Sequence, residues 1–135
     1  MILLFHILIF SFILLSAYLD YVTIVVDKIT IDSRGHRHRL IFRIFIATFI
    51  SGCFINQHQP DWSTLYELAI YVFYVSSWFW LVFDISLNFA RKLPILYVGK
   101  NGFLDVLFRN EEGLYLLIKL LSLIASGYMY YNLIR

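Results

Sequence analysis

Residues 68–83 read LAIYVFYVSSWFWLVF, and this stretch contains no charged side chain. A helix needs about 20 mostly apolar residues to cross a bilayer, because the hydrocarbon core is about 30 Å thick and a helix rises about 1.5 Å per residue. The apolar run extends back to Trp62, with Glu67 as its only charge. We therefore predict a membrane-spanning helix over residues 62–83.

Three other apolar runs are of similar length, and they cover residues 2–24, 38–55 and 114–134. Hydrophobic residues make up 61% of the chain and charged residues 15%, whereas a soluble domain contains about 25% charged residues. The fold class that this composition predicts is all-α, a four-helix transmembrane bundle. Residues 1–135 then form a single integral membrane domain, because the connections are too short to build a soluble domain.

The first apolar run allows two other interpretations. A signal peptide begins with basic residues, but no Lys or Arg precedes Lys28, so we expect a spanning helix instead. Residues 22–32 are rich in β-branched types and can form a small hairpin. We favour the alternative in which they are the fraying end of the first helix, which then runs past Asp20 to Val26.

The basic residues indicate how the helices are oriented. The predicted loops over residues 27–39 and 84–113 contain four Lys or Arg each, and residues 56–61 contain none. Cytoplasmic loops are enriched in Lys and Arg, so we predict an N-out and C-out topology with both basic loops in the cytoplasm. Aromatic residues of an outer membrane belt are expected at Trp62, Tyr66, Tyr128, Tyr130 and Tyr131.

Polar residues follow the third apolar run at helical spacing. Asp84, Asn88 and Arg91 lie four and three positions apart, so they share one face of a helix that leaves the membrane. Pro94 ends that helix at Leu93. We expect the next residues to form a structured cytoplasmic loop, held by a polar clasp of Asp84, Asn88, Arg91, Tyr97 and Asp105. The alternative makes Asp84 a proton or cation ligand at a pore mouth.

The run DISLNFARKLPILYVGKNGFLD, residues 84–105, resembles a pattern found in small four-span membrane proteins of bacteriophages of Bacteroidetes-like hosts. The pattern is Asp-x3-Asn-x2-Arg followed by Tyr-x-Gly and Asp, and it covers 22 of the 135 residues. No activity is assigned to that group. The resemblance implies a phage or phage-derived context, with the protein in the bacterial inner membrane or in a virion membrane.

The predicted first loop contains a basic group formed by Arg34, His36, Arg37, His38 and Arg39. The histidines resemble a metal pair, but the neighbouring arginines repel a cation and no further ligand completes a site, so no metal is expected. Contact with anionic lipid headgroups, or with packaged nucleic acid, is one interpretation of this group. A plain topology signal explains the same residues and is the interpretation that we favour.

Among the charged residues within the apolar runs, Asp20, Arg43 and Lys119 are the candidates for a pore or for an intramembrane ion pair. We expect Arg43 and Lys119 to extend their side chains to the membrane interface. If Lys119 instead points into the bundle, its expected partner is Asp20 or Asp84, because an unpaired charge in hydrocarbon costs at least about 2.5–3.5 kcal/mol. Such a buried pair would mark either helix registry or an ion path.

The sequence contains no catalytic constellation and no phosphate-binding loop, so we expect no enzyme, no cofactor and no small-molecule substrate. The function that we favour is a structural or assembly role in a lipid bilayer, as a homo-oligomer or with other membrane or virion subunits. A small oligomeric ion channel or holin-like permeabiliser is the alternative, with Asp84, Arg43 and Lys119 along the path. A third hypothesis is a regulator that binds anionic lipid or a partner through the first loop.

Overall fold

The computed structural model describes residues 2–28, 33–55, 62–95, 97, 107–108 and 111–134, and gives only the backbone for residues 33, 34, 36, 37 and 134. Over these residues the chain is helical, which confirms the all-α prediction. The described residues contain four long α-helices and one π-helical segment, namely α1 (Ile2–Tyr21), η1 (Val22–Val26), α2 (Ser33–Phe54), α3 (Trp62–Ala90) and α5 (Glu112–Ile134).

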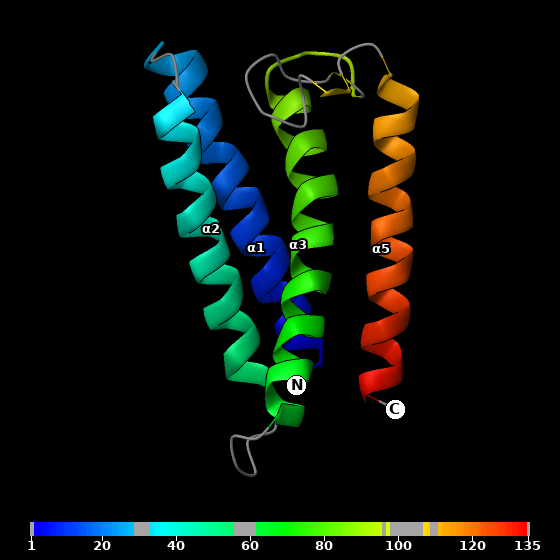
Figure 1. Cartoon of the computed structure of the whole chain (residues 1–135). Helices are drawn as coiled ribbons and strands as arrows, with labels where there is room; N and C mark the ends of the chain where they lie inside the picture. The colour runs from blue at the N-terminus through cyan, green and yellow to red at the C-terminus, as the bar shows by residue number, and fades with distance from the viewer. Residues whose placement is uncertain are drawn as a thin grey trace.

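The helices run alternately up and down, and the two chain termini lie at the same end of the molecule (Figure 1). Helix α3 is the central element, because it packs against α1, α2 and α5. The backbone of helix α5 approaches that of α3 alone (Figure 1), and its side chain Tyr130 reaches the ring of Phe5 on α1, with ring centres 5.9 Å apart. The fold is therefore organised around one shared helix, and one side of α5 is left open.

A narrow buried stripe holds α1 against the rest of the molecule. Phe5, Ile9, Ile13 and Ala17 recur every fourth residue, which places them on one helix face, and all are buried. The other faces of α1 are equally apolar but exposed, with Leu3 at 74% exposure. Soluble monomers do not expose apolar surface of this extent, so lipid must cover it.

Three helical segments are long and apolar enough to cross a membrane, namely Ile2–Val26, Trp62–Ala90 and Glu112–Leu133. Their lengths agree with the thickness of a bilayer core. Together with the exposed apolar faces, they identify a membrane protein. This result confirms three of the four predicted apolar spans by length and composition.

Helix α2 does not belong to that set, because its first turns are basic. It begins at Ser33 rather than at residue 38, so the predicted loop over residues 27–39 was too long. Arginine favours the helical state almost as strongly as leucine, and the basic stretch therefore continues the helix instead of ending it. A prediction of membrane spans from hydropathy alone does not detect a helix that continues beyond the apolar run.

The residues after α1 form a π-helical turn, not a hairpin. Val22–Val26 extend the first helix, which confirms the prediction that it runs past Asp20 to Val26. The backbone N–H of Asp27 donates to the carbonyl of Val22 at 2.9 Å, as a π-helix requires. Short π-helical segments occur frequently at functional sites, and this one directly follows Asp20.

Helix α3 continues past the apolar run, as predicted, but ends at Ala90 rather than at Leu93. Lys92 has a positive φ of 56°. The N–H of Leu93 donates to Asn88 O at 2.9 Å and that of Lys92 to Phe89 O at 3.0 Å. This is a Schellman end, completed before Pro94 is reached.

Candidate functional site

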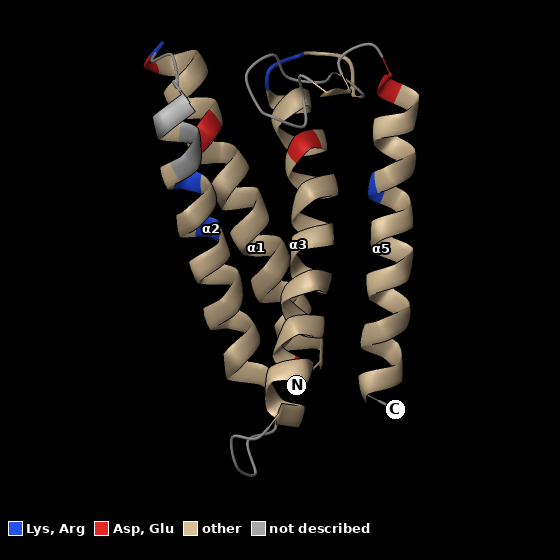
Figure 2. Ribbon diagram, viewed as in Figure 1, with Lys and Arg blue, Asp and Glu red and all other residues tan. Residues whose placement is uncertain are grey.

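Most of the charged positions in the described chain lie in the half of the molecule away from the termini (Figure 2). Five of these charged residues form two interhelical clusters. One joins α1 to α2 and contains Asp20, and the other joins α3 to α5 and contains Asp84. These clusters are the strongest candidates for a functional site, because ionised groups inside a membrane protein are costly unless they are paired.

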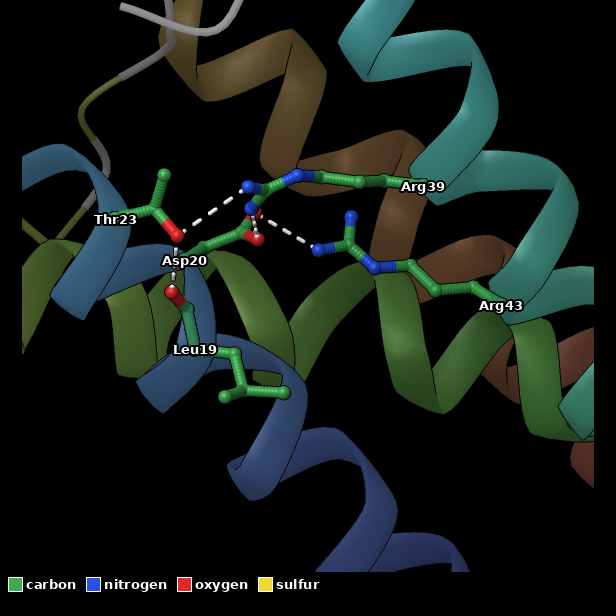
Figure 3. A network of polar contacts seen from close by, with 5 residues as sticks. All are labelled: Leu19, Asp20, Thr23, Arg39 and Arg43. Carbon is green, nitrogen blue, oxygen red and sulfur yellow. Dashed lines mark hydrogen bonds and ion pairs between the residues drawn. The ribbon is translucent and has the colours of Figure 1, made fainter. Parts of the chain in front are cut away.

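In the first cluster, the carboxylate of Asp20 accepts from two guanidinium groups (Figure 3). Arg39 Nη1 donates to Asp20 Oδ1, and Arg43 Nη2 donates to Asp20 Oδ2 at 2.8 Å. Arg39 Nη2 also donates to the hydroxyl of Thr23 at 3.3 Å, and that hydroxyl donates to Leu19 O at 2.9 Å. One acid, two bases and a hydroxyl thus form one network between α1, η1 and α2.

Aromatic rings of α3 complete this cluster. The guanidinium carbon of Arg43 lies 4.4 Å from the ring centre of Phe83 and 5.3 Å from that of Phe79, within cation–π range. The guanidinium of Arg43 thus has partners on both α1 and α3, and its extension to the membrane interface stays a prediction. Asp20, on the preceding helix, draws the guanidinium inward, and Phe83 covers one of its faces.

In the second cluster, Lys119 Nζ donates to Asp84 Oδ2. The Lys119 side chain is only 5% exposed, whereas that of Asp84 is 31% exposed. The ammonium also lies 3.9 Å from the ring centre of Tyr115. The prediction that Lys119 extends to the interface is wrong, and the buried alternative with Asp84 as partner is correct. Asp20 is not that partner, because it is taken by the arginines.

Within the described residues, Asn88 makes the hydrogen bonds of the predicted polar clasp. Its Nδ2 donates to Ile95 O at 3.1 Å and to Tyr97 O at 2.8 Å, so a buried amide ties the chain after Pro94 back to α3. Asp84 points to Lys119 instead, and Arg91 has no ion-pair partner among the described residues. Arg91 therefore takes no part in the clasp within the described residues. Asp105 lies outside the described residues.

A small cavity of about 20 Å³ opens between α3 and α5 beside this second cluster. Its polar walls come from Asp84, Asn88, Glu112 and Lys119. A cavity of this size holds about one water molecule. It therefore suits a bridging water or a transferred proton better than an organic ligand.

The basic group of the predicted first loop lies in the first turns of α2. His38 is exposed, and Arg39 is bound in the Asp20 network. The side chains of Arg34, His36 and Arg37 lie outside the described part of the structure. Arg39 therefore binds the buried carboxylate of Asp20 while part of its side chain stays exposed. Its place in a basic run did not indicate this contact.

Sequence reasoning missed an aromatic cluster near the termini. Tyr130, predicted to lie in the outer aromatic belt, is buried and stacks on Tyr74 with ring centres 4.4 Å apart. His6 joins them, since its Nε2 lies 3.0 Å from the Tyr74 hydroxyl and its Nδ1 lies 2.8 Å from Ile2 O. One neutral tautomer satisfies both contacts. Tyrosines within apolar runs are the only sequence signal for this cluster.

A serine pair supports the same helix contact. Ser77 and Ser122 have their hydroxyl oxygens 3.0 Å apart between α3 and α5, and such interhelical hydrogen bonds between serines are typical of packed membrane helices.

Comparison with protein-family models, with curated proteins and with solved structures finds no match for this chain. The case for its function therefore depends on the two charged clusters and on the packing around α3.

Proposed function

We propose that the protein is a structural or assembly subunit of a membrane, with no enzymatic activity, that works as a homo-oligomer. In this proposal all four helices span the bilayer, both termini face outward, and the connections at the charged end face the cytoplasm. The proposed membrane is a bacterial inner membrane or a virion membrane. The phage context is supported by the residue pattern over 84–105 alone.

The observation that carries the proposal is the pairing of the buried charges. Asp20 binds Arg39 and Arg43, and Lys119 binds Asp84, in each case across a contact between neighbouring helices. Charges used in this way specify which helix faces meet. A conduction path would instead be expected to align polar groups along the length of a helix, and here they gather at one end (Figure 2).

Helix α2 is the span that needs a separate argument, because it is too basic by composition. Its two inner arginines are neutralised by Asp20 and covered by Phe83. The remainder of the helix, from Ile44 to Phe54, contains no charged residue. Alongside α1 (Figure 1), the whole helix of 22 residues has the length to cross the bilayer, with its basic side chains extended toward the headgroup level.

Homo-oligomer formation is supported by the open side of α5, which among the described helices has its backbone close to α3 alone. A helix of a second copy would pack there without displacing any contact within the chain.

The alternative function is a small oligomeric ion channel or permeabiliser. The cavity lined by Asp84, Asn88 and Lys119 supports it, because ionisable groups around a water site are typical of proton and ion paths. In this case conduction would pass between α3 and α5 and would depend on the carboxylate of Asp84.

Three measurements test the proposal. Purified protein in liposomes should give no proton or ion flux above that of empty liposomes, and chemical cross-linking in the same liposomes should give a defined oligomer. Reporter fusions should place both termini outside and residue 37 inside. A flux that disappears in Asp84→Asn would replace the structural role with the channel, and a uniform monomer would remove the homo-oligomer.

A further inference from the structure

We infer that Arg39 and Arg43 form a binding site for a phosphate ester, supplied by the headgroup of an anionic phospholipid. The inference names a ligand that the proposed structural role does not require. It rests on the proposed placement of the first turns of α2 at the membrane surface, which the reporter fusions test separately.

The first argument is the charge of the cluster. Among the described residues, Asp20 is the one carboxylate bound to these two guanidinium groups, so within this part of the chain the cluster has one more positive charge than negative. The second cluster differs, because Lys119 and Asp84 balance each other. An uncompensated charge in a partly buried position at a membrane surface favours an anionic ligand.

The second argument is the supply of hydrogen-bond donors. Arg43 uses Nη2 for Asp20, and Arg39 uses Nη1 and Nη2 for Asp20 and Thr23. The other N–H groups of both side chains have no acceptor among the described residues. A guanidinium binds phosphate through exactly such N–H edges, often with two parallel hydrogen bonds.

The third argument is access. Within the described chain, the fully buried side-chain atoms that lack a partner are Ser51 Oγ and Trp78 Nε1. The nitrogens of Arg39 and Arg43 that have no partner are therefore not fully buried, in agreement with side-chain exposures of 30% and 18%. Phe83 covers a face of the Arg43 guanidinium, which leaves its edges for a ligand.

The fourth argument is orientation. Asp20 holds both guanidinium groups from one side, between α1 and α2 (Figure 3), so they lose less conformational freedom when a ligand binds. Basic pockets between membrane helices are typical binding sites for phospholipid headgroups. A phosphate would occupy the outer side of the pair, opposite the carboxylate.

The test measures lipid retention by the full-length protein. Protein in a neutral detergent is mixed with phosphatidylglycerol or with phosphatidylcholine, and bound lipid is counted by native mass spectrometry. We expect the wild type to retain phosphatidylglycerol preferentially. Arg43→Gln should weaken that retention about tenfold, the size expected from losing one charged hydrogen bond, and Arg43→Lys should recover only part of it because lysine lacks the planar edge.

Arg91→Gln is the matched control, because it removes the same charge from the same end of the molecule and Arg91 has no ion-pair partner among the described residues. It should leave retention unchanged. Equal losses in Arg43→Gln and Arg91→Gln would overturn the inference in favour of general surface charge. Equal retention of both lipids by the wild type would overturn it as well.

A competition experiment identifies the source of the phosphate. Glycerol 1-phosphate carries the same ester without acyl chains. If it fails to displace phosphatidylglycerol, the site belongs to the lipid, as inferred. If it displaces the lipid at concentrations similar to those of the lipid itself, the phosphate site stands but its ligand is a soluble ester, which overturns the lipid assignment. Circular dichroism of each variant checks that loss of retention is not loss of fold.

Discussion

The molecule contains two helical hairpins that solve the same electrostatic problem differently. In α1–α2 and in α3–α5, an acid near the end of the first helix meets a base in the early turns of the second. The first hairpin uses one acid and two bases, and the second uses one of each. The cluster of the first hairpin therefore has a net positive charge, and either arginine can neutralise Asp20 without the other. The cluster of the second hairpin is neutral, and Asp84 is the only described ion-pair partner of the Lys119 ammonium.

Burial follows the same division. The lone base of the second hairpin is 5% exposed, but the two arginines of the first are 30% and 18% exposed. A buried ammonium without its partner cannot reach water, while a partly exposed guanidinium can. We conclude that the second pair is a fixed structural contact, and that the first can exchange partners without losing the hairpin.

The largest effect is expected from breaking the neutral pair. Asp84→Ala should lower the free energy of unfolding by about 3 kcal/mol, the lower end of the range for an orphaned buried charge, because Asp84 itself is partly exposed. Unfolding in mixed detergent micelles, followed by circular dichroism, measures this. Asp84→Leu combined with Lys119→Met should recover most of the loss, and a double variant as unstable as Asp84→Ala would contradict the explanation.

The next effect concerns the chain after Pro94, which the side-chain amide of Asn88 holds against α3. Asn88→Leu removes the donor to the carbonyls of Ile95 and Tyr97, and we expect a cost of about 2 kcal/mol because two acceptors lose their partner. Hydrogen exchange around residues 93–97 should rise first. Asn132→Leu is the matched control, since Asn132 is exposed and should cost little; equal effects would sink the idea.

A smaller effect is expected in the first hairpin. Arg43→Gln should cost about 1 kcal/mol, because Arg39 continues to neutralise Asp20. The sharper readout is coupling, measured by the same unfolding assay. Arg39→Gln with Arg43→Gln should cost more than the sum of the two single changes, since only the double variant leaves Asp20 buried and unpaired. If the two single losses of stability simply add up in the double variant, one arginine does not replace the other as partner of Asp20.

The smallest effect tests the end of α3. Lys92→Gly should raise the free energy of unfolding by about 0.5–1 kcal/mol, because glycine adopts the positive φ of this position without strain. Arg91→Gly, at the capping residue just after α3, should lower it by about 1 kcal/mol, because Arg91 has no positive φ and its N–H still makes a helical hydrogen bond to Leu87 O. If both changes shift stability in the same direction, the assigned helix end is incorrect.

Much of the fold could be predicted because its signals are local. The uncharged run before Asp84 is long enough to span a bilayer wherever it packs, and Pro94 limits any helix that precedes it. The start of α2 was misplaced because hydropathy does not register that arginine favours a helix. Asp84 and Asn88 were recognised on one helix face, but the sequence left Lys119 with two possible partners and a favoured exposed position, because spacing along one helix does not show which face of another helix it meets.

What the sequence by itself determined is the solvent of this protein. Too few polar residues exist to cover its helices in water, so apolar length and composition lead to a membrane whatever the helices contact. Only the tertiary structure decided the pairing, with Asp20 going to two arginines and Asp84 to Lys119. The physical reason is rotation: successive residues point about 100° apart around a helix, so a small turn of α3 about its axis changes which charges meet.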